Sequence, residues 1–371
     1  MLIGADVKPT DSNREAFQEG KCVLADGLRQ RWMQADVRLL NLETPLIDGG
    51  TPSLKCGSNF SAPVSCARGV AELCPSAVSL CNNHILDYGE EGMLSTIRAL
   101  RSEKVETFGV GDDLSSADKP VILVKNGVRI GVYAVCENEF SVATERTGGA
   151  NPLNLLELSD RIRGVRGSCD RLIVLYHGGR EYYPYPSPQT QRVCRKIAEC
   201  GASLVLCQHS HCVGSYEKWD NATIVYGQGN FLFDAETKNE CYDTGLLVSY
   251  TIGEYGAEQV KFVPIVRVPG GAALAEEARA AEILNAFELR SRRLRIQGFV
   301  EARYRVYASE MKEKMLKVIV SGHVVTRSVN VLYGRRPTRM LSPRNKVDLL
   351  NSLRCESIRE LLTEGLCHDI F

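Results

Sequence analysis

The stretch Leu204-Val205-Leu206-Cys207-Gln208-His209-Ser210-His211 joins a short apolar run to a pair of histidines. Four apolar residues in a row predict a buried β-strand, and the polar residues that follow predict its end. Two imidazoles separated by one residue can reach neighbouring metal ions, because imidazole is a common ligand for Zn, Fe, Mn and Ni. A single histidine in such a loop is more often an ordinary hydrogen-bonded residue. A metal site is therefore predicted only if other parts of the chain supply further ligands.

Residues 1 to about 266 repeat this pattern of a short apolar run followed by a polar loop. The predicted strands are Val37–Leu42, Ala77–Cys81, Val128–Cys136, Leu172–Tyr176, Leu204–Cys207, Thr223–Tyr226, Leu246–Ile252 and Val260–Val268. Helical patterns lie between several of them, at Gly92–Arg101 and Gln189–Cys200. The alternation predicts an α/β fold in which strand ends present loops.

The character of the sequence changes after Pro269-Gly270-Gly271. Helices are predicted over Ala272–Arg295, Phe299–Val320 and Lys346–Thr363, which are rich in helix-forming residues. We therefore expect an α/β domain over residues 1–268 and a helical, basic region over 269–371.

The composition excludes several classes of protein. The chain has 371 residues, of which 44% are hydrophobic and 24% charged, so it is neither disordered nor collagen-like. No apolar run approaches the ~20 residues needed to cross a bilayer. The first residues lack the features of a signal peptide, and the 14 cysteines form no C-x-x-C pair, as expected of thiols in a reducing compartment. We expect a cytoplasmic protein.

The zero net charge hides a basic segment, residues 290–346, which holds 15 Lys and Arg against the three acids Glu301, Glu310 and Glu313. Three interpretations are open. The residues cover solvated helix faces that pair with acids elsewhere, they dock on an anionic polymer or membrane surface, or they bind nucleic acid. No known nucleic-acid-binding motif is present, so specific nucleic-acid binding is not expected.

Carboxylates and further histidines also stand at predicted strand ends. Asp6 closes the first strand and Glu43 the second, while His84 and His177 follow two others. Carboxylates beside imidazoles make a mixed oxygen and nitrogen site of the type that holds a pair of divalent cations. Such metals, ~3.5–4 Å apart, clamp the attacking and leaving oxygens of a phosphoryl displacement.

Six motifs follow one another along the chain: Gly4-Ala5-Asp6, Asn41-Leu42-Glu43-Thr44-Pro45, Asn82-Asn83-His84 with Asp87-Tyr88-Gly89, His177-Gly178-Gly179 with Glu181-Tyr182, His209-Ser210-His211, and Tyr226-Gly227-Gln228-Gly229-Asn230-Phe231 with Phe233-Asp234. In this order they resemble the CapA family of poly-γ-glutamate capsule biosynthesis proteins, which is related to the calcineurin-like metallophosphoesterases. The resemblance spans residues 1 to about 250. It does not include the C-terminal third.

The resemblance implies a four-layer α/β/β/α sandwich, extended by C-terminal helices, with one or two divalent ions (Mn, Fe or Zn) at the strand ends. The implied metal ligands are Asp6 and His211 for the first metal, Asn83, His177 and His209 for the second, and Glu43 as a bridge. His84 would be the catalytic residue, which protonates the leaving oxygen or stabilises the transition-state charge. Residues implied to bind substrate or support the ligands are Lys8, Asn82, Asp87, Glu181 and Asn230.

Two functions remain open at this stage. One is a metal-dependent hydrolase that acts on a phosphoester or on an anionic, poly-γ-glutamate-like polymer of the cell envelope. The other is a non-catalytic accessory or polymer-binding protein of capsule or polysaccharide biosynthesis. Lys8 favours the second, because metallophosphoesterases usually carry a histidine at that position, whereas the retained His84 favours the first. Asp87 also has an ordinary interpretation as a helix-capping or turn residue.

Overall fold

Two β-sheets lie face to face in the computed structural model, which describes residues 1–233, 240–253, 256–320 and 343–370. The first sheet has the strand order β16-β15-β14-β1-β2-β3-β4, and β13 pairs with β1. Its strands are β1 (Leu2–Val7), β2 (Arg38–Leu42), β3 (Ala77–Ser79), β4 (Thr107–Phe108), β13 (Asn230–Leu232), β14 (Thr244–Ile252), β15 (Glu258–Val268) and β16 (Gly271–Leu274). β1 to β4 and β13 run parallel, and β14 to β16 add an antiparallel edge.

The second sheet has the order β11-β12-β10-β9-β7-β6. Its strands are β6 (Val121–Lys125), β7 (Val128–Cys136), β9 (Arg171–His177), β10 (Leu204–Gln208), β11 (Tyr216–Trp219) and β12 (Ala222–Val225). Residues of β7 alternate between two cores, since neighbouring side chains of a strand point to opposite faces. Val132 and Ala134 join the core between the sheets, whereas Tyr133 and Val135 join the core under the outer helices. A third, two-stranded sheet pairs β5 (Val110–Gly111) with β8 (Gly149–Ala150).

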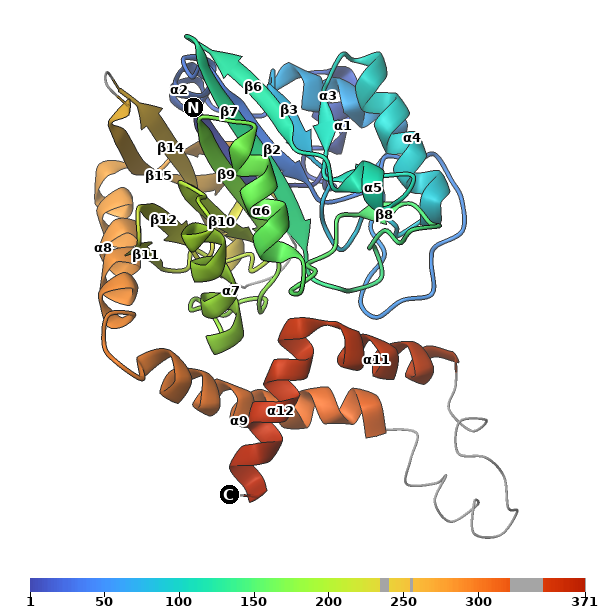
Figure 1. Ribbon diagram of the computed structural model, residues 1–371. Helices are drawn as coiled ribbons and strands as arrows, with labels where there is room; N and C mark the ends of the chain where they lie inside the picture. The colour runs from blue at the N-terminus through green and yellow to red at the C-terminus, as the bar shows by residue number, and fades with distance from the viewer. Residues whose placement is uncertain (234–239, 254–255, 321–342, 371) are drawn as a thin grey trace.

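Helices cover the outer faces of both sheets, which completes the predicted four layers (Figure 1). On the first sheet lie α1 (Arg14–Glu19), α2 (Asp26–Met33), α3 (Ala67–Glu72) and α4 (Gly89–Ser102). On the second lie α6 (Leu158–Gly167) and α7 (Pro188–Glu199), and the short α5 (Leu114–Ala117) and two 3₁₀ turns, Val64–Cys66 and Glu240–Tyr242, occupy loops. The fold predicted for the first two thirds of the chain is confirmed.

The C-terminal third contains α8 (Glu277–Arg293), α9 (Phe299–Val320), α11 (Pro343–Arg354) and α12 (Glu356–Ile370). α8 closes one side of the sandwich, because its Phe287 ring lies 5.1 Å from Tyr216 of β11 and 4.8 Å from Phe262 of β15. α9, α11 and α12 gather at one end of the two sheets (Figure 1). The division of the chain near residue 269 stays a prediction.

Two predicted helices of this region were wrong in detail. The helix expected over Ala272–Arg295 starts only at Glu277, because Gly271–Leu274 pairs with the edge of β15 as a strand. The helix expected over Lys346–Thr363 is two helices, α11 and α12, that meet at the buried Cys355. Both differences arise from contacts with distant parts of the chain.

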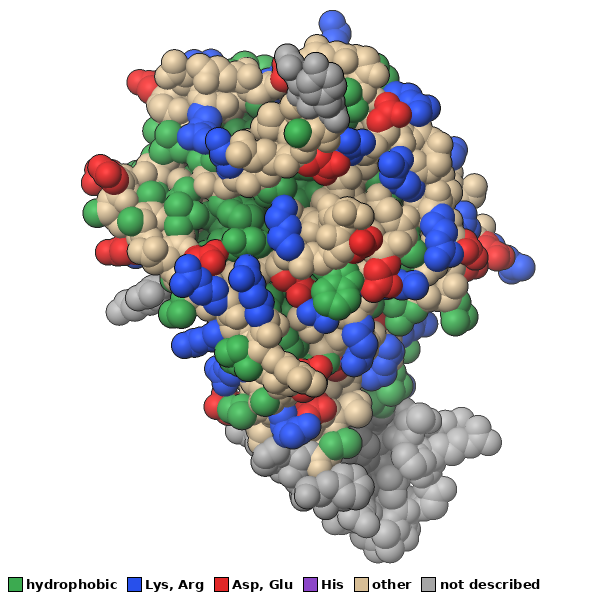
Figure 2. All heavy atoms as spheres, turned by 60° about the vertical axis from the view of Figure 1, so that its left-hand side comes forward, with side chains coloured by type: hydrophobic (Ala, Val, Ile, Leu, Met, Phe, Trp, Pro, Cys, Tyr) green, Lys and Arg blue, Asp and Glu red, His purple; other side chains and the backbone are tan. Residues whose placement is uncertain are grey.

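Residues 290–320 and 343–346 of the basic segment are described, and residues 321–342 lie outside the described ranges. Two of its arginines pair with acids on the helix surface, Arg292 with Glu288 at 3.0 Å and Arg305 with Glu364 at 2.9 Å. Figure 2 shows Lys and Arg side chains interspersed with Asp and Glu on this face of the molecule. These pairs agree with the interpretation of the basic segment as solvated helix faces whose cations pair with acids elsewhere.

Within the described ranges, no helix has both the length and the apolar character needed to cross a membrane. The cytoplasmic location stays a prediction.

Candidate metal centre

The parallel strands of both sheets end at the same edge of the sandwich, and the candidate ligands stand there. Asp6 lies near the end of β1, and Glu43 directly follows β2. His177 is the last residue of β9, and His209 directly follows β10, whose register pairs Gln208 with His177. Residues far apart in the sequence therefore meet because their strands lie side by side.

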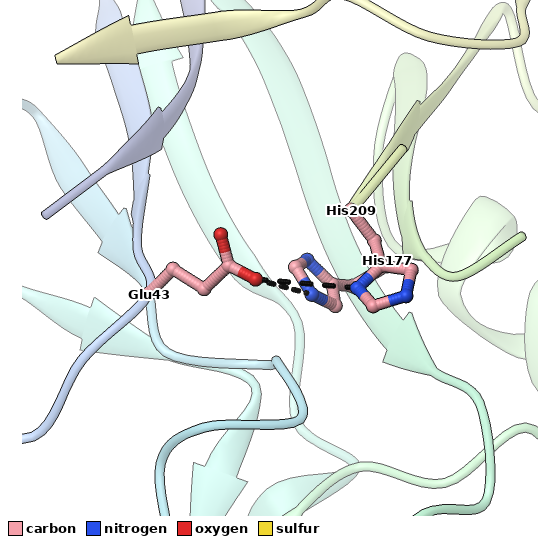
Figure 3. A group of neighbouring side chains, drawn as sticks. All are labelled: Glu43, His177 and His209. Carbon is pink, nitrogen blue, oxygen red and sulfur yellow. Dashed lines mark ion pairs between the residues drawn. The ribbon is translucent and has the colours of Figure 1, made fainter. Parts of the chain in front are cut away.

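The Glu43 carboxylate is the centre of this cluster. It is fully buried, and neither oxygen has a hydrogen-bond partner among the described residues. Its Oε1 lies 3.3 Å from His177 Nε2, 4.0 Å from His209 Nδ1 and 3.9 Å from His211 Nε2. Figure 3 shows the carboxylate pointing toward the rings of His177 and His209.

Two groups of buried side chains share this carboxylate. In one, Glu43 meets His177 and His209, and in the other it meets Asp6 and His211, with all ligand atoms of a group within 4.8 Å of one another. Asn83 joins the first group, since its Oδ1 lies 3.0 Å from His177 Nε2. The structure thus brings together the residues predicted for two metals with Glu43 between them.

Buried amides hold the ligands in place. Asn41 Nδ2 donates to Asp6 Oδ1 at 2.8 Å, and Asn82 Nδ2 donates to Asn41 Oδ1 at 3.1 Å. Asn230 Oδ1 lies 2.9 Å from His211 Nδ1, which leaves the other ring nitrogen of that histidine directed toward Glu43. Such contacts set the orientation and tautomer of a ligating imidazole.

The H-x-H segment has an unusual backbone. His209 and His211 both adopt left-handed conformations, with φ of 83° and 51°. A non-glycine residue in this region costs of order 1 kcal/mol, and such residues concentrate at functional sites. The His209 amide also donates to Asp6 Oδ2 at 3.2 Å, so the turn connects the two halves of the cluster.

Burial controls the charges of the cluster. Burial, followed by the neighbouring Asp6 carboxylate, raises the pKa of Glu43 well above its usual value. Burial lowers the pKa of His177 and of His209, so both rings are neutral, the form that binds metal. For His211 the lowering by burial is outweighed by Glu43 and Asp6, and its pKa is raised.

The donor set fits divalent transition metals. Imidazole nitrogens, carboxylates and one amide oxygen suit Zn, Fe and Mn, and a cation between the two groups would give the Glu43 oxygens the partners they lack. The fold of this chain therefore supplies a site for divalent metal binding. The identity of the metal stays a prediction.

His84 belongs to a second buried network beside the cluster. Its Nδ1 lies 2.7 Å from Asp87 Oδ2 and 3.1 Å from Lys55 Nζ, and Lys55 also pairs with Asp87. The Phe60 ring stacks on the imidazole at 3.9 Å between centroids. Burial lowers the pKa of His84 well below its usual value, and burial raises the pKa of Asp87 to about 6. Asp87 therefore orients His84, which is a more specific task than a helix cap.

A cleft of about 440 Å³ opens over these residues. Asn83, His84, His209 and His211 line it, together with the predicted residues Lys8 and Glu181. Lys8 Nζ lies 3.7 Å above the Phe60 ring, so the residue that replaces the expected histidine reaches the cleft as a cation.

Several residues of the site were not among those predicted from the sequence. Asn41, Lys55 and Phe60 support the ligands and His84, and Glu139, Arg180 and Tyr242 line the cleft. Asn41 stood inside a quoted motif, and Arg180 lies between Gly179 and Glu181 of another. The other four come from segments whose sequences gave no indication of their position.

A sequence profile described as "Bacterial capsule synthesis protein PGA_cap" matches residues 6–235 of this chain. A curated protein from Bacillus anthracis, "Capsule biosynthesis protein CapA", is 27% identical over 216 residues, which cover 56% of this chain and 51% of that protein. A protein from Mycobacterium tuberculosis (strain ATCC 25618 / H37Rv), named as a probable polyglutamine synthesis accessory protein, is 24% identical over 219 residues, which cover 54% of this chain and 56% of that protein. The chain thus spans about half the length of these curated relatives.

Among solved structures, a 5′-nucleotidase from Candida albicans SC5314 is 12% identical, with a TM-score of 0.42 over 78% of this chain and 56% of that chain. This likeness is too distant to bear on function. The matched profile covers more than half of the chain and includes every predicted ligand. The chain belongs to the bacterial capsule synthesis protein family PGA_cap.

Proposed function

We propose that this protein is a metal-dependent hydrolase that acts on a phosphoester or on an anionic polymer of the poly-γ-glutamate type. Mn, Fe and Zn are the proposed metals, in one or two sites. The observation that carries the proposal is the Glu43 carboxylate, fully buried among three imidazoles with no hydrogen-bond partner for either oxygen among the described residues. An ionised carboxylate in such a place needs a cation.

Asp6, Glu43 and His211 would hold one ion, and Glu43, His177, His209 and Asn83 the other. Bound divalent ions would polarise the scissile bond and lower the pKa of a bound water toward ~7. His84 lies in the same cleft with Nδ1 engaged by Asp87 and Lys55, so its Nε2 is the ring atom left for substrate. From there it would exchange a proton with the leaving oxygen or stabilise charge on it.

The cleft also supplies positive charge for an anionic substrate. Lys8, Lys55 and Arg180 line it, and Asn82 fixes the loop that carries Asn83 and His84 through its contacts with Asn41 and the His84 amide. The relative from Bacillus anthracis is named for capsule biosynthesis, which is the basis for proposing an anionic polymer as one substrate class. The basic segment 290–346 would add a peripheral contact with such a polymer.

An accessory, polymer-binding role is the second candidate. Lys8 favours it, because a charged amine occupies the place where metallophosphoesterases usually carry a ligand histidine and lies over Phe60 instead. One relative is itself named as an accessory protein.

A turnover assay distinguishes the hydrolase from the accessory protein. The Mn- or Zn-loaded protein is tested with p-nitrophenyl phosphate, bis(p-nitrophenyl) phosphate and poly-γ-glutamate. A hydrolase loses turnover by about 100-fold or more in His84→Ala, with bound metal unchanged. Asp170→Asn, at the opposite end of β9 from His177, is the matched control and should keep full activity. Tight binding of poly-γ-glutamate without turnover of any of the three would establish the accessory role instead.

A further inference from the structure

The C-terminal helices form part of the wall of the substrate cleft. Met315 of α9, Asn351 of α11 and Ile358 of α12 line the same cavity as the histidines of the candidate centre. The family profile ends at residue 235, so these helices lie outside the matched region. Any selectivity that they provide would come from residues outside the matched region.

Specific hydrogen bonds fix these helices against the site. Glu356, the first residue of α12, accepts from the Asn138 amide at 2.9 Å and from its side chain at 2.7 Å. One turn later, Glu360 accepts from the Gln189 amide at 2.7 Å, at the start of α7. Asn138 lies in the loop that follows β7, so α12 is held at the strand ends.

Asn351 is the notable residue of this wall. It is 3% exposed, it lines the cleft, and its side-chain oxygen has no hydrogen-bond partner among the described residues. A buried polar atom without a partner costs about 1–3 kcal/mol. A donor on a bound ligand would satisfy the amide oxygen and recover this cost.

Glu139, from the loop after β7, supplies a carboxyl group to the same cleft. Its Oε1 lies 3.9 Å from Sγ of Cys355, the residue between α11 and α12, so the C-terminal helices contact this part of the lining. The cations Lys8 and Arg180 and three of the candidate metal ligands, Asn83, His209 and His211, also line the cleft and would receive the anionic part of a ligand.

Size adds a further restriction. A volume of about 440 Å³ lies in the ~300–1,000 Å³ range of small-molecule sites. We propose, as an extension of the hydrolase function proposed above, that the C-terminal helices make this cleft selective for a small phosphomonoester whose organic group carries a hydroxyl or amino donor. Asn351 is the specificity residue that accepts a hydrogen bond from this donor.

Two probes test the selectivity by binding. Glycerol 3-phosphate carries hydroxyl donors, and phenyl phosphate carries none on its organic group. Dissociation constants are measured by calorimetry with the Mn-loaded full chain in the His84→Ala background, which keeps turnover from consuming the ligand. Asn351→Leu should weaken glycerol 3-phosphate about tenfold and leave phenyl phosphate within about twofold. Asn351→Asp, which keeps an acceptor, should retain the preference, and Leu353→Ala, 61% exposed on the same helix, should change neither constant.

Met315→Trp provides an independent test, because a larger side chain on the wall should weaken both esters even if Asn351→Leu fails to fold. Equal weakening of both esters by Asn351→Leu, or no binding of glycerol 3-phosphate to the parent protein, would overturn the proposal. The proposal would also be overturned if poly-γ-glutamate bound more tightly than either ester and Met315→Trp left that binding unchanged.

Turnover is measured separately with His84 intact. Selective binding without turnover would support the selectivity and contradict only the hydrolase.

Discussion

At the scale of the residue, Glu43 distinguishes this cluster from an ordinary buried core. Folding buries its carboxylate completely, provides no hydrogen-bond donor from the described residues, and raises its pKa through burial. A group whose pKa is raised by folding contributes fully to stability below its unfolded pKa, and this contribution is lost as the pH rises through the folded pKa. Above its unfolded pKa, Glu43 therefore lowers the stability of the native state, and a bound cation would remove this cost by favouring the ionised form.

The substitution Glu43→Gln should have opposite effects with and without metal. In EDTA at pH 8, the amide removes the cost of burying the titratable carboxyl group, and the melting temperature should rise, at about 1–2 °C per kcal/mol for a chain of this length. With Mn or Zn present, the parent protein gains stability from binding and the variant should gain less. Differential scanning calorimetry measures both. A lower melting temperature for the variant in EDTA would contradict this account of Glu43.

The buried pair of Lys55 and Asp87 should couple strongly. Lys55 is 6% exposed and Asp87 is fully buried, so Lys55→Met leaves an uncompensated carboxylate and should cost about 3–5 kcal/mol. The double variant Lys55→Met/Asp87→Asn should recover at least about 1 kcal/mol of that loss in urea unfolding. Arg129→Met, which breaks the exposed pair with Asp170, is the control and should cost less than about 1 kcal/mol. Additive effects of the buried pair would show that the two charges do not stabilise one another.

The residues that the motifs indicated and those that they missed differ in their position along the chain. Asp6, Glu43, His177 and His209 stand at strand ends, and a strand end can be recognised from the apolar run before it. Lys55 lies in a loop 29 residues from His84, without a periodic pattern that would indicate its neighbours. Its role depends on how the chain between β2 and β3 folds back over the site, which the sequence alone does not define.

At the scale of the element, strands were easier to predict than the ends of helices. β7 from Ile130 onward and β10 up to Cys207 lack charged side chains, because both faces of these strands are buried in a four-layer fold. β16 has the sequence Gly-Ala-Ala-Leu, which has little strand propensity, and becomes a strand only because β15 offers an unpaired edge. The break at Cys355 has a similar origin, since this residue is buried against Glu137 and no glycine or proline lies next to the break.

The loop after β7 should impose a pH dependence on stability. Burial, followed by the neighbouring Glu137, raises the pKa of Glu139 to about 7. Since the folded pKa is the higher one, its contribution is present below the unfolded pKa of about 4.5 and is lost as the pH rises through 7. Glu139→Gln should therefore raise the free energy of unfolding at pH 8 by about 1–2 kcal/mol, after allowance for partial exposure, and by much less at pH 5.

This prediction is measured by urea unfolding in EDTA at both pH values. Glu145→Gln, an exposed acid further along the same segment, is the matched control and should show no difference between them. An equal effect of Glu139→Gln at pH 5 and pH 8 would show that burial does not control the charge of this carboxylate.

At the scale of the whole molecule, the C-terminal helices complete a cleft whose other residues lie within or close to the region that the family profile matches. The sequence indicated the helical character of the C-terminal region and its positive charge, but not its contact with the site. That contact depends on hydrogen bonds between residues 218 positions apart, such as Asn138 with Glu356. Such a pairing depends on the folded surfaces and leaves no local pattern in either segment.

The central claim is that folding assembles a metal centre around Glu43, and elemental analysis of the purified protein tests it most directly. After reconstitution with Mn or Zn, the parent protein should hold about one or two equivalents of metal per chain, and this should be lost or halved in His209→Ala. Asp170→Asn should keep the full amount. A parent protein that binds no metal after reconstitution, or a His209→Ala variant with unchanged metal content, would contradict the account.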